Sequence, residues 1–215
     1  MDKLKNTEEQ NLKAYLSFDN NDLKGKVVYQ TAFINILLSL LGPIFAVCSY
    51  VTWIIAAVVS VVFIIFMIHF KTKALPTQRY INFYYATAMV FMSVNLCYNS
   101  CVFFSQTSVG IVFPMLVYII ALPLCAYLMI YSECKRIIEG YHKDKKFVNP
   151  AILSAVISGA ALGAFSVKMI EEQSDENFIL GMCCGILGVI LSLFSRFFVK
   201  WYCHYILSEK EAENT

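Results

Sequence analysis

Residues 27–70 read VVYQTAFINILLSLLGPIFAVCSYVTWIIAAVVSVVFIIFMIHF, a run of 44 positions without Asp, Glu, Lys or Arg. Three more uncharged runs follow, at 80–132, 147–167 and 177–195. The four runs hold 137 of the 215 residues, and 59% of the chain is apolar. Soluble domains are only about 45–50% apolar and scatter their charges along the chain. The sequence therefore excludes a soluble enzyme and a disordered chain, and it predicts an all-α polytopic membrane protein.

The length of each run decides how many times the chain crosses the membrane. A helix needs roughly 20 residues to cross a hydrocarbon core of about 30 Å, so the two longer runs must each fold back once. The first has a polar turn near 48–52 and the second at 105–110. We expect six transmembrane helices in three antiparallel hairpins, with spans at about 28–47, 53–70, 82–104, 111–131, 150–167 and 177–199. Segments 1–26 and 201–215 form the two tails that flank this membrane domain of 27–200.

Lys and Arg fall on one side of this arrangement. Of the 17 basic residues, 16 belong to the N-terminal tail, to the second–third and fourth–fifth connections and to the C-terminal end from Arg196 onward, and only Lys168 lies on the opposite side. Basic residues are retained in the cytoplasm. We therefore expect both termini to be cytoplasmic, in the plasma membrane if the protein is bacterial.

Polar segments on the cytosolic side carry two further signals. The stretch 7–10, Thr-Glu-Glu-Gln, fits a capping box, and an amphipathic helix with Leu12, Tyr15 and Leu16 on one face should follow it. A basic cluster at Lys143, Lys145 and Lys146 predicts contact with anionic lipid head groups. The alternative for this cluster is that it only sets the topology.

The spans contain no ionisable residue near their midpoints, which argues against a proton relay or a charged selectivity ring. The third span instead carries Asn95, Tyr98 and Asn99, of which the two asparagines lie one helical turn apart. Such a face either lines a neutral path for a ligand or ion, or forms hydrogen bonds between helices. Pro43 and Pro123 each remove a backbone donor from a span and predict kinks.

Small residues repeat at a spacing of three or four in the last two spans. They are Ala155, Gly159 and Gly163 in the fifth, and Gly181, Gly185 and Gly188 in the sixth. This pattern allows close helix approach. We expect the two spans to pack on each other through these residues, and the alternative is that one stripe contacts a second copy of the chain.

Motifs for catalysis or metal binding are not found. The sequence holds no phosphate-binding Gly-rich loop, HExxH helix or GxSxG elbow, and no zinc-ligand spacing among its eight cysteines. We expect no catalytic residue, no metal and no cofactor.

The sequence therefore favours a binding protein over an enzyme. We expect a non-enzymatic protein that binds a partner in the bilayer or at its cytosolic face, as an accessory, immunity-type or assembly factor. The alternative is a small transporter or channel subunit with a neutral polar path along the third span. Expected partners are the lipid bilayer, with anionic lipid among them, and a membrane protein or second copy of the chain, but no nucleic acid.

Overall fold

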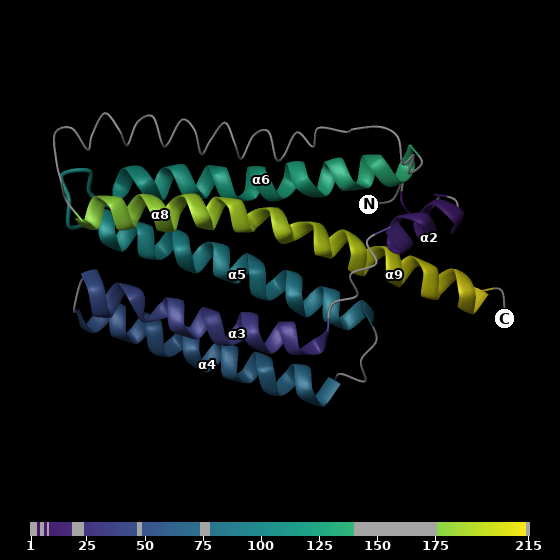
Figure 1. The fold of residues 1–215 in the computed structure, drawn as a ribbon, viewed down its shortest axis with the longest axis horizontal. Helices are drawn as coiled ribbons and strands as arrows, with labels where there is room; N and C mark the ends of the chain where they lie inside the picture. Colours follow the sequence, from purple (N-terminus) through teal and green to yellow (C-terminus); the bar gives the residue numbers. More distant parts are fainter. Residues whose placement is uncertain are drawn as a thin grey trace.

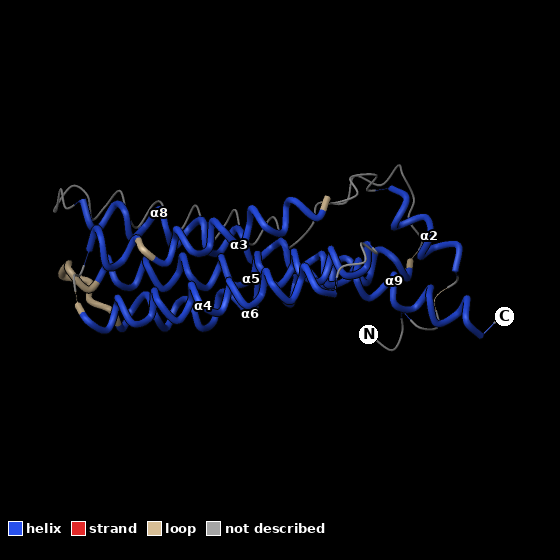
Figure 2. Tube along the Cα trace, turned by 90° about the horizontal axis from the view of Figure 1, so that it is seen from below, coloured by secondary structure: helices blue, strands red, loops and turns tan. Residues whose placement is uncertain are grey.

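A computed structural model describes residues 4, 7, 9–18, 24–46, 49–73, 78–139 and 176–213. These residues form helices and short turns, and no β-strand occurs among them (Figure 2). The helices are α2 (Glu9–Phe18), α3 (Gly25–Ser39), α4 (Tyr50–Lys73), α5 (Gln78–Phe104), α6 (Val112–Ile138), α8 (Glu176–Leu191) and α9 (Arg196–Glu213). A π-helical segment, η1 (Gly42–Ala46), follows α3, and a 3₁₀ turn, η2 (Ser192–Ser195), joins α8 to α9.

Five stretches are long and apolar enough to cross a membrane. They are Gly25–Phe45, Tyr50–Thr72, Gln78–Phe104, Val112–Ile138 and Glu176–Ala212. The expected all-α fold with membrane-length helices is thus confirmed for the described residues. These five correspond to five of the six expected spans, and the other, 150–167, lies outside the described residues.

The helix α5 lies at the centre of the bundle, between α3 on one side and α8 with α9 on the other (Figure 1). In its most apolar stretch 72% of residues are buried, against 17% in α4. Small side chains such as Ala86, Ala88 and Ser93 allow its neighbours to approach closely. By contrast, α4 exposes Ile54, Val58 and other large apolar side chains, as expected of a helix that faces lipid.

The last helical stretch is longer than expected. Its 37 residues correspond to about 55 Å at 1.5 Å per residue, well beyond a hydrocarbon core of about 30 Å. The boundary expected at residue 200 falls inside α9, which continues because Val199, Cys203 and Ile206 keep an apolar face that packs on α2.

Two prolines behave differently from each other. Pro43 has no N–H to donate to the Ser39 carbonyl, and the backbone widens into a π-helix over Gly42–Ala46. Pro123 lies within α6, which stays α-helical from Val112 to Ile138.

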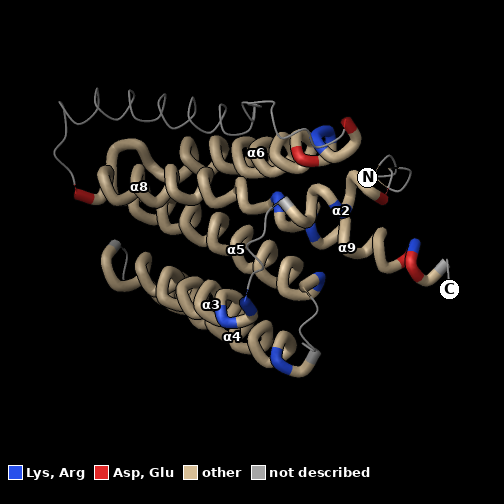
Figure 3. The backbone as a smooth tube through the Cα atoms, turned by 45° about the vertical axis from the view of Figure 1, so that its right-hand side comes forward, with Lys and Arg blue, Asp and Glu red and all other residues tan. Residues whose placement is uncertain are grey.

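Charged residues gather at one end of the bundle, where α3 and α5 begin and α4 and α6 end (Figure 3). We call this the basic end; its described cations include Lys24, Lys71, Arg79, Lys135, Arg136, Lys200 and Lys210. Both α2 and α9 lie at this end (Figure 1). The far end carries the acidic start of α8 at Glu176.

Candidate functional site

The two asparagines of the third span bond to the first. Asn95 donates from Nδ2 to the carbonyl of Asn35 at 3.0 Å, and Asn99 donates to the carbonyl of Leu38 at 2.9 Å. Asn99 also donates to the carbonyl of Asn95 at 2.9 Å. In the other direction, Asn35 donates to the carbonyl of Ala88 at 3.0 Å. These side chains tie α3 to α5, as expected of amides buried in hydrocarbon.

Tyr98 does not join this network. Its side chain is half-buried, whereas Asn95 and Asn99 are buried, and it makes no hydrogen bond to another described residue. The structure therefore brings together two of the three residues proposed for a path.

Two amide oxygens in this network are buried without a hydrogen-bond partner among the described residues. They are Oδ1 of Asn35 and Oδ1 of Asn99. The Asn99 oxygen faces Gly42 at the start of η1, where a Cβ atom would lie 3.1 Å from it. Because Nδ2 of Asn99 already faces two carbonyls, exchanging the amide oxygen and nitrogen would lose both bonds.

The glycine stripe of α8 faces α5 and α6. Ser93 of α5 donates to the carbonyl of Gly188, and Ser100 donates to the carbonyl of Gly181, both at 2.5 Å. Tyr118 of α6 hydrogen-bonds Ser100 at 2.7 Å and lies where a side chain on Gly185 would extend. The glycines thus permit hydrogen bonds that larger residues would block. The expected pairing with Ala155, Gly159 and Gly163 lies outside the described residues, as does the predicted lipid cluster Lys143, Lys145 and Lys146.

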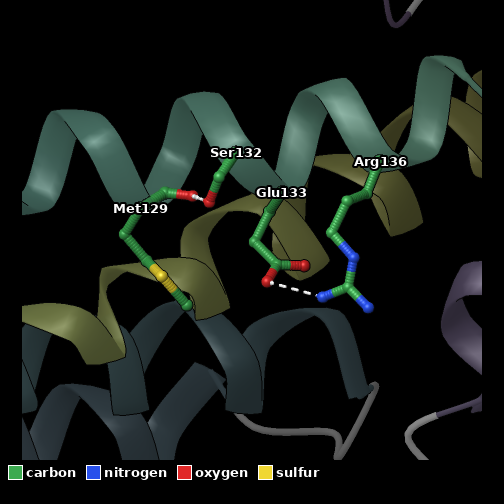
Figure 4. Close-up of polar contacts among 4 residues, drawn as sticks. All are labelled: Met129, Ser132, Glu133 and Arg136. Carbon is green, nitrogen blue, oxygen red and sulfur yellow. Dashed lines mark hydrogen bonds and ion pairs between the residues drawn. The ribbon is translucent and has the colours of Figure 1, made fainter. Parts of the chain in front are cut away.

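A buried carboxylate marks the basic end. Glu133, near the end of α6, is 4% exposed, and Arg136, one turn further along the same helix, donates to its Oε1 at 3.3 Å (Figure 4). Ionised groups are costly to bury unless they are paired and hydrogen-bonded. The same turn of α6 carries Met129 and Ser132, whose hydroxyl donates to the Met129 carbonyl (Figure 4).

The amphipathic helix α2 covers this carboxylate. Leu12 and Tyr15 pack against Ile137 of α6 and against Val199 and Cys203 of α9. Burial raises the pKa of the Tyr15 hydroxyl well above its ordinary value, and the neighbouring Glu133 charge and a hydrogen bond to Glu133 raise it further. Tyr15 therefore stays protonated and can donate to the carboxylate.

A second contact fastens the start of this segment. The ammonium of Lys210 in α9 donates to the carbonyl of Thr7 at 2.8 Å. The docked α2 thus joins the N-terminal segment to both α6 and α9.

A groove lies beside this cluster, between the first turn of α5 and the last turns of α9. It encloses about 390 Å³ and is lined by Gln78, Arg79, Tyr80, His204, Leu207, Ser208 and Glu211. The Arg79 guanidinium lies 4.6 Å from the ring centroid of Tyr205. Its Nε is buried and has no hydrogen-bond partner among the described residues.

Little in the sequence indicated the buried carboxylate of Glu133 or the groove between α5 and α9. Glu133 and Arg136 have the spacing of an exposed helical ion pair, and nothing local distinguishes them from Lys135 and Glu139, which form one. In the described segments no three His, Cys, Asp or Glu side chains come close enough to share a metal ion.

No protein-family model, no curated protein and no solved structure matches this chain significantly, so its function has to be inferred from its own geometry.

Proposed function

We propose that this protein is a non-enzymatic, multi-pass membrane protein that binds a protein partner at its basic end. In this proposal six spans form three hairpins in the plasma membrane, and both termini are cytoplasmic. The observation that carries the proposal is the division of polar groups within the fold. Buried amide and hydroxyl groups of α3 and α5 bond helix to helix, whereas the buried carboxylate and most charges lie at the basic end.

The packing of the interior supports recognition over transport. Asn95, Asn99, Ser93 and Ser100 each bond to a backbone carbonyl of a neighbouring helix. Such contacts contribute about 0.6–2 kcal/mol each in a membrane. A path along α5 would require these bonds to open.

The docked α2 supplies a recognition surface at this end. One face of the helix is buried on α6 and α9, and the opposite face presents the exposed ion pair of Glu9 with Lys13. Hydrogen bonding to Lys13 and its positive charge lower the pKa of Glu9, so the pair stays charged at neutral pH. A charged outer face on a segment held by α6 and α9 suits a partner with a polar, charged surface.

Site-specific crosslinking in native membranes tests this proposal. With a photo-crosslinking amino acid at Lys13, we expect one discrete protein adduct. With the same amino acid at Ile65, which is 60% exposed on α4, we expect crosslinks to lipid only. A protein adduct at Ile65 and none at Lys13 would place the partner in the bilayer and contradict docking at the basic end.

Transport along α5 is the second candidate, and one observation favours it. The Oδ1 atoms of Asn35 and Asn99 are buried carbonyl-type oxygens without described partners, a donor type that binds cations or polar solutes. The oxygen of Asn99 lies beside the π-helical η1, and irregular membrane helices often flank binding sites in carriers.

Substitution of both α5 asparagines distinguishes the two candidates. In proteoliposomes, Asn95→Leu with Asn99→Leu should leave solute and ion flux at the level of protein-free vesicles, as for the parent protein. Partner crosslinking from Lys13 should persist if the double variant folds. Flux in the parent that the double variant loses would establish the transport function instead, with Phe91→Leu on the exposed side of α5 as the matched control.

A further inference from the structure

We infer that the groove between α5 and α9 binds a phosphate group, presented by an anionic membrane lipid at the basic end. Its principal ligand is Arg79. This site is formed by residues other than Lys143, Lys145 and Lys146, and it does not depend on the proposed protein partner.

The guanidinium of Arg79 is held in place but not neutralised. Its face stacks on Tyr205, at 4.6 Å from the ring centroid, and lies 5.9 Å from the centroid of Tyr80. Stacking of this kind uses the face of the group and leaves its N–H donors available at the edge. Among the described residues no carboxylate lies within ion-pair distance of Arg79.

The Nε of Arg79 is a second feature that points to an anionic ligand. A buried donor without an acceptor costs about 1–3 kcal/mol, and the Nε of Arg79 is such a donor. The Nε and Nη groups of arginine form a fork that matches two oxygens of one phosphate. Because the Nε has no accessible surface, a phosphate in the groove would satisfy this donor once the Arg79 side chain turns toward it.

The rest of the groove fits the same ligand. Gln78 and His204 line it with groups that can donate hydrogen bonds to phosphate oxygens, whereas the Ser208 hydroxyl already donates to the Tyr205 carbonyl at 2.7 Å. The groove's volume of about 390 Å³ accommodates a head group. The one carboxylate of the lining is Glu211, which is exposed and disfavours an anion at that side. Arg79 is thus the charged residue that gives the groove its preference for an anionic ligand.

The position of the groove favours a lipid as the source of the phosphate. Arg79 lies in the first turn of the membrane-length helix α5, and Tyr80, Trp201 and Tyr205 lie at the same end. Tyr and Trp concentrate where membrane spans meet the head groups. A phosphate at this level is that of a lipid, although phosphate in solution offers the same chemistry.

Lipid binding to the full-length protein in detergent tests the site. We expect native mass spectrometry to show phosphatidylglycerol retained about tenfold better than phosphatidylcholine. Arg79→Gln should abolish this preference, and Arg79→Lys, which keeps the charge but not the fork, should reduce it partly. Glu211→Gln should strengthen phosphatidylglycerol binding. Lys71→Gln, which removes an exposed cation at the same end but outside the groove, should behave as the parent protein does.

Competition with inorganic phosphate distinguishes a lipid head group from free phosphate as the ligand. If millimolar phosphate displaces phosphatidylglycerol, the site takes phosphate from solution and the lipid assignment is wrong; if it does not, the lipid assignment stands. Should Arg79→Gln fail to fold, Ser208→Trp fills the groove and leaves every charge in place. A folded Arg79→Gln or Ser208→Trp variant that keeps the lipid preference would overturn the site, as would an equal loss in Lys71→Gln. Crosslinking from Lys13 is unaffected by either result, so this inference and the proposed function fail independently.

Discussion

Gly188→Ala will force α8 away from α5 and lower the free energy of unfolding by about 1–3 kcal/mol. A Cβ atom at Gly188 would lie 2.6 Å from Sγ of Cys97, 2.9 Å from the carbonyl oxygen of Ser93 and 3.2 Å from the backbone nitrogen of Cys97. Two of these three atoms belong to the backbone of α5, which cannot rotate out of the way. The shift also lengthens the hydrogen bond from Ser93 to the Gly188 carbonyl. Reversible unfolding in bicelles, followed by circular dichroism, measures the loss.

The matched control is Gly25→Ala. A Cβ atom there would meet only the Phe70 ring, at an ordinary contact distance of 3.7 Å, so the free energy of unfolding should stay within about 0.5 kcal/mol of the parent value. Gly185→Ala should be destabilising but less so than Gly188→Ala, because the atoms it meets are the tip of Tyr118 and the hydroxyl of Ser100. Equal stability of Gly188→Ala and Gly25→Ala would contradict the close packing of α8 on α5.

Leu12→Asp will release α2 from the bundle and speed tryptic cleavage after Lys13 at least tenfold. Leu12 is 0% exposed and packs in the cluster formed with α6 and α9. Losing its burial costs about 1.5–3 kcal/mol, and a carboxylate cannot be buried there without a partner. A free helix of 10 residues is not stable in water, so the released segment becomes a protease substrate.

Gln10→Asp is the control for this experiment. It introduces the same charge on the exposed side of α2 and should leave the cleavage rate unchanged. Equal protection of the Leu12→Asp variant and the parent protein in nanodiscs would show that α2 does not depend on the apolar cluster for its position.

The sequence predicted the membrane-length helices well, because uncharged runs of that length have few alternatives to a helix in lipid. The helices run past the spans that it predicted: α4 begins at Tyr50 rather than at 53, and α5 begins at Gln78 rather than at 82. Charges and aromatic residues at the interface stop a hydrophobic run but do not stop a helix. Hydropathy alone therefore predicts the number of these helices better than it predicts their length.

The candidate site could be predicted only in part. The spacing of Asn95 and Asn99 correctly placed them on a shared buried face, but their acceptors are backbone carbonyls of α3, and every residue has such a group. Likewise, the glycine spacing indicated close packing without identifying α5 as the partner. The burial of Glu133 depends on Tyr15, which lies more than 100 positions earlier in the chain, so no local pattern could indicate it.

The central position of α5 has a consequence for biosynthesis. It is the least apolar of the five membrane-length helices, and Ser93 bonds to Gly188, which is synthesised 95 residues later. At roughly 5–20 residues per second, the ribosome needs about 5–19 s to produce that partner. Meanwhile α3, which is made first, can already accept bonds from Asn95 and Asn99. The nascent α5 can therefore pair with α3 first and with Tyr118 of α6 next, whereas Ser93 reaches its acceptor only after α8 has been made.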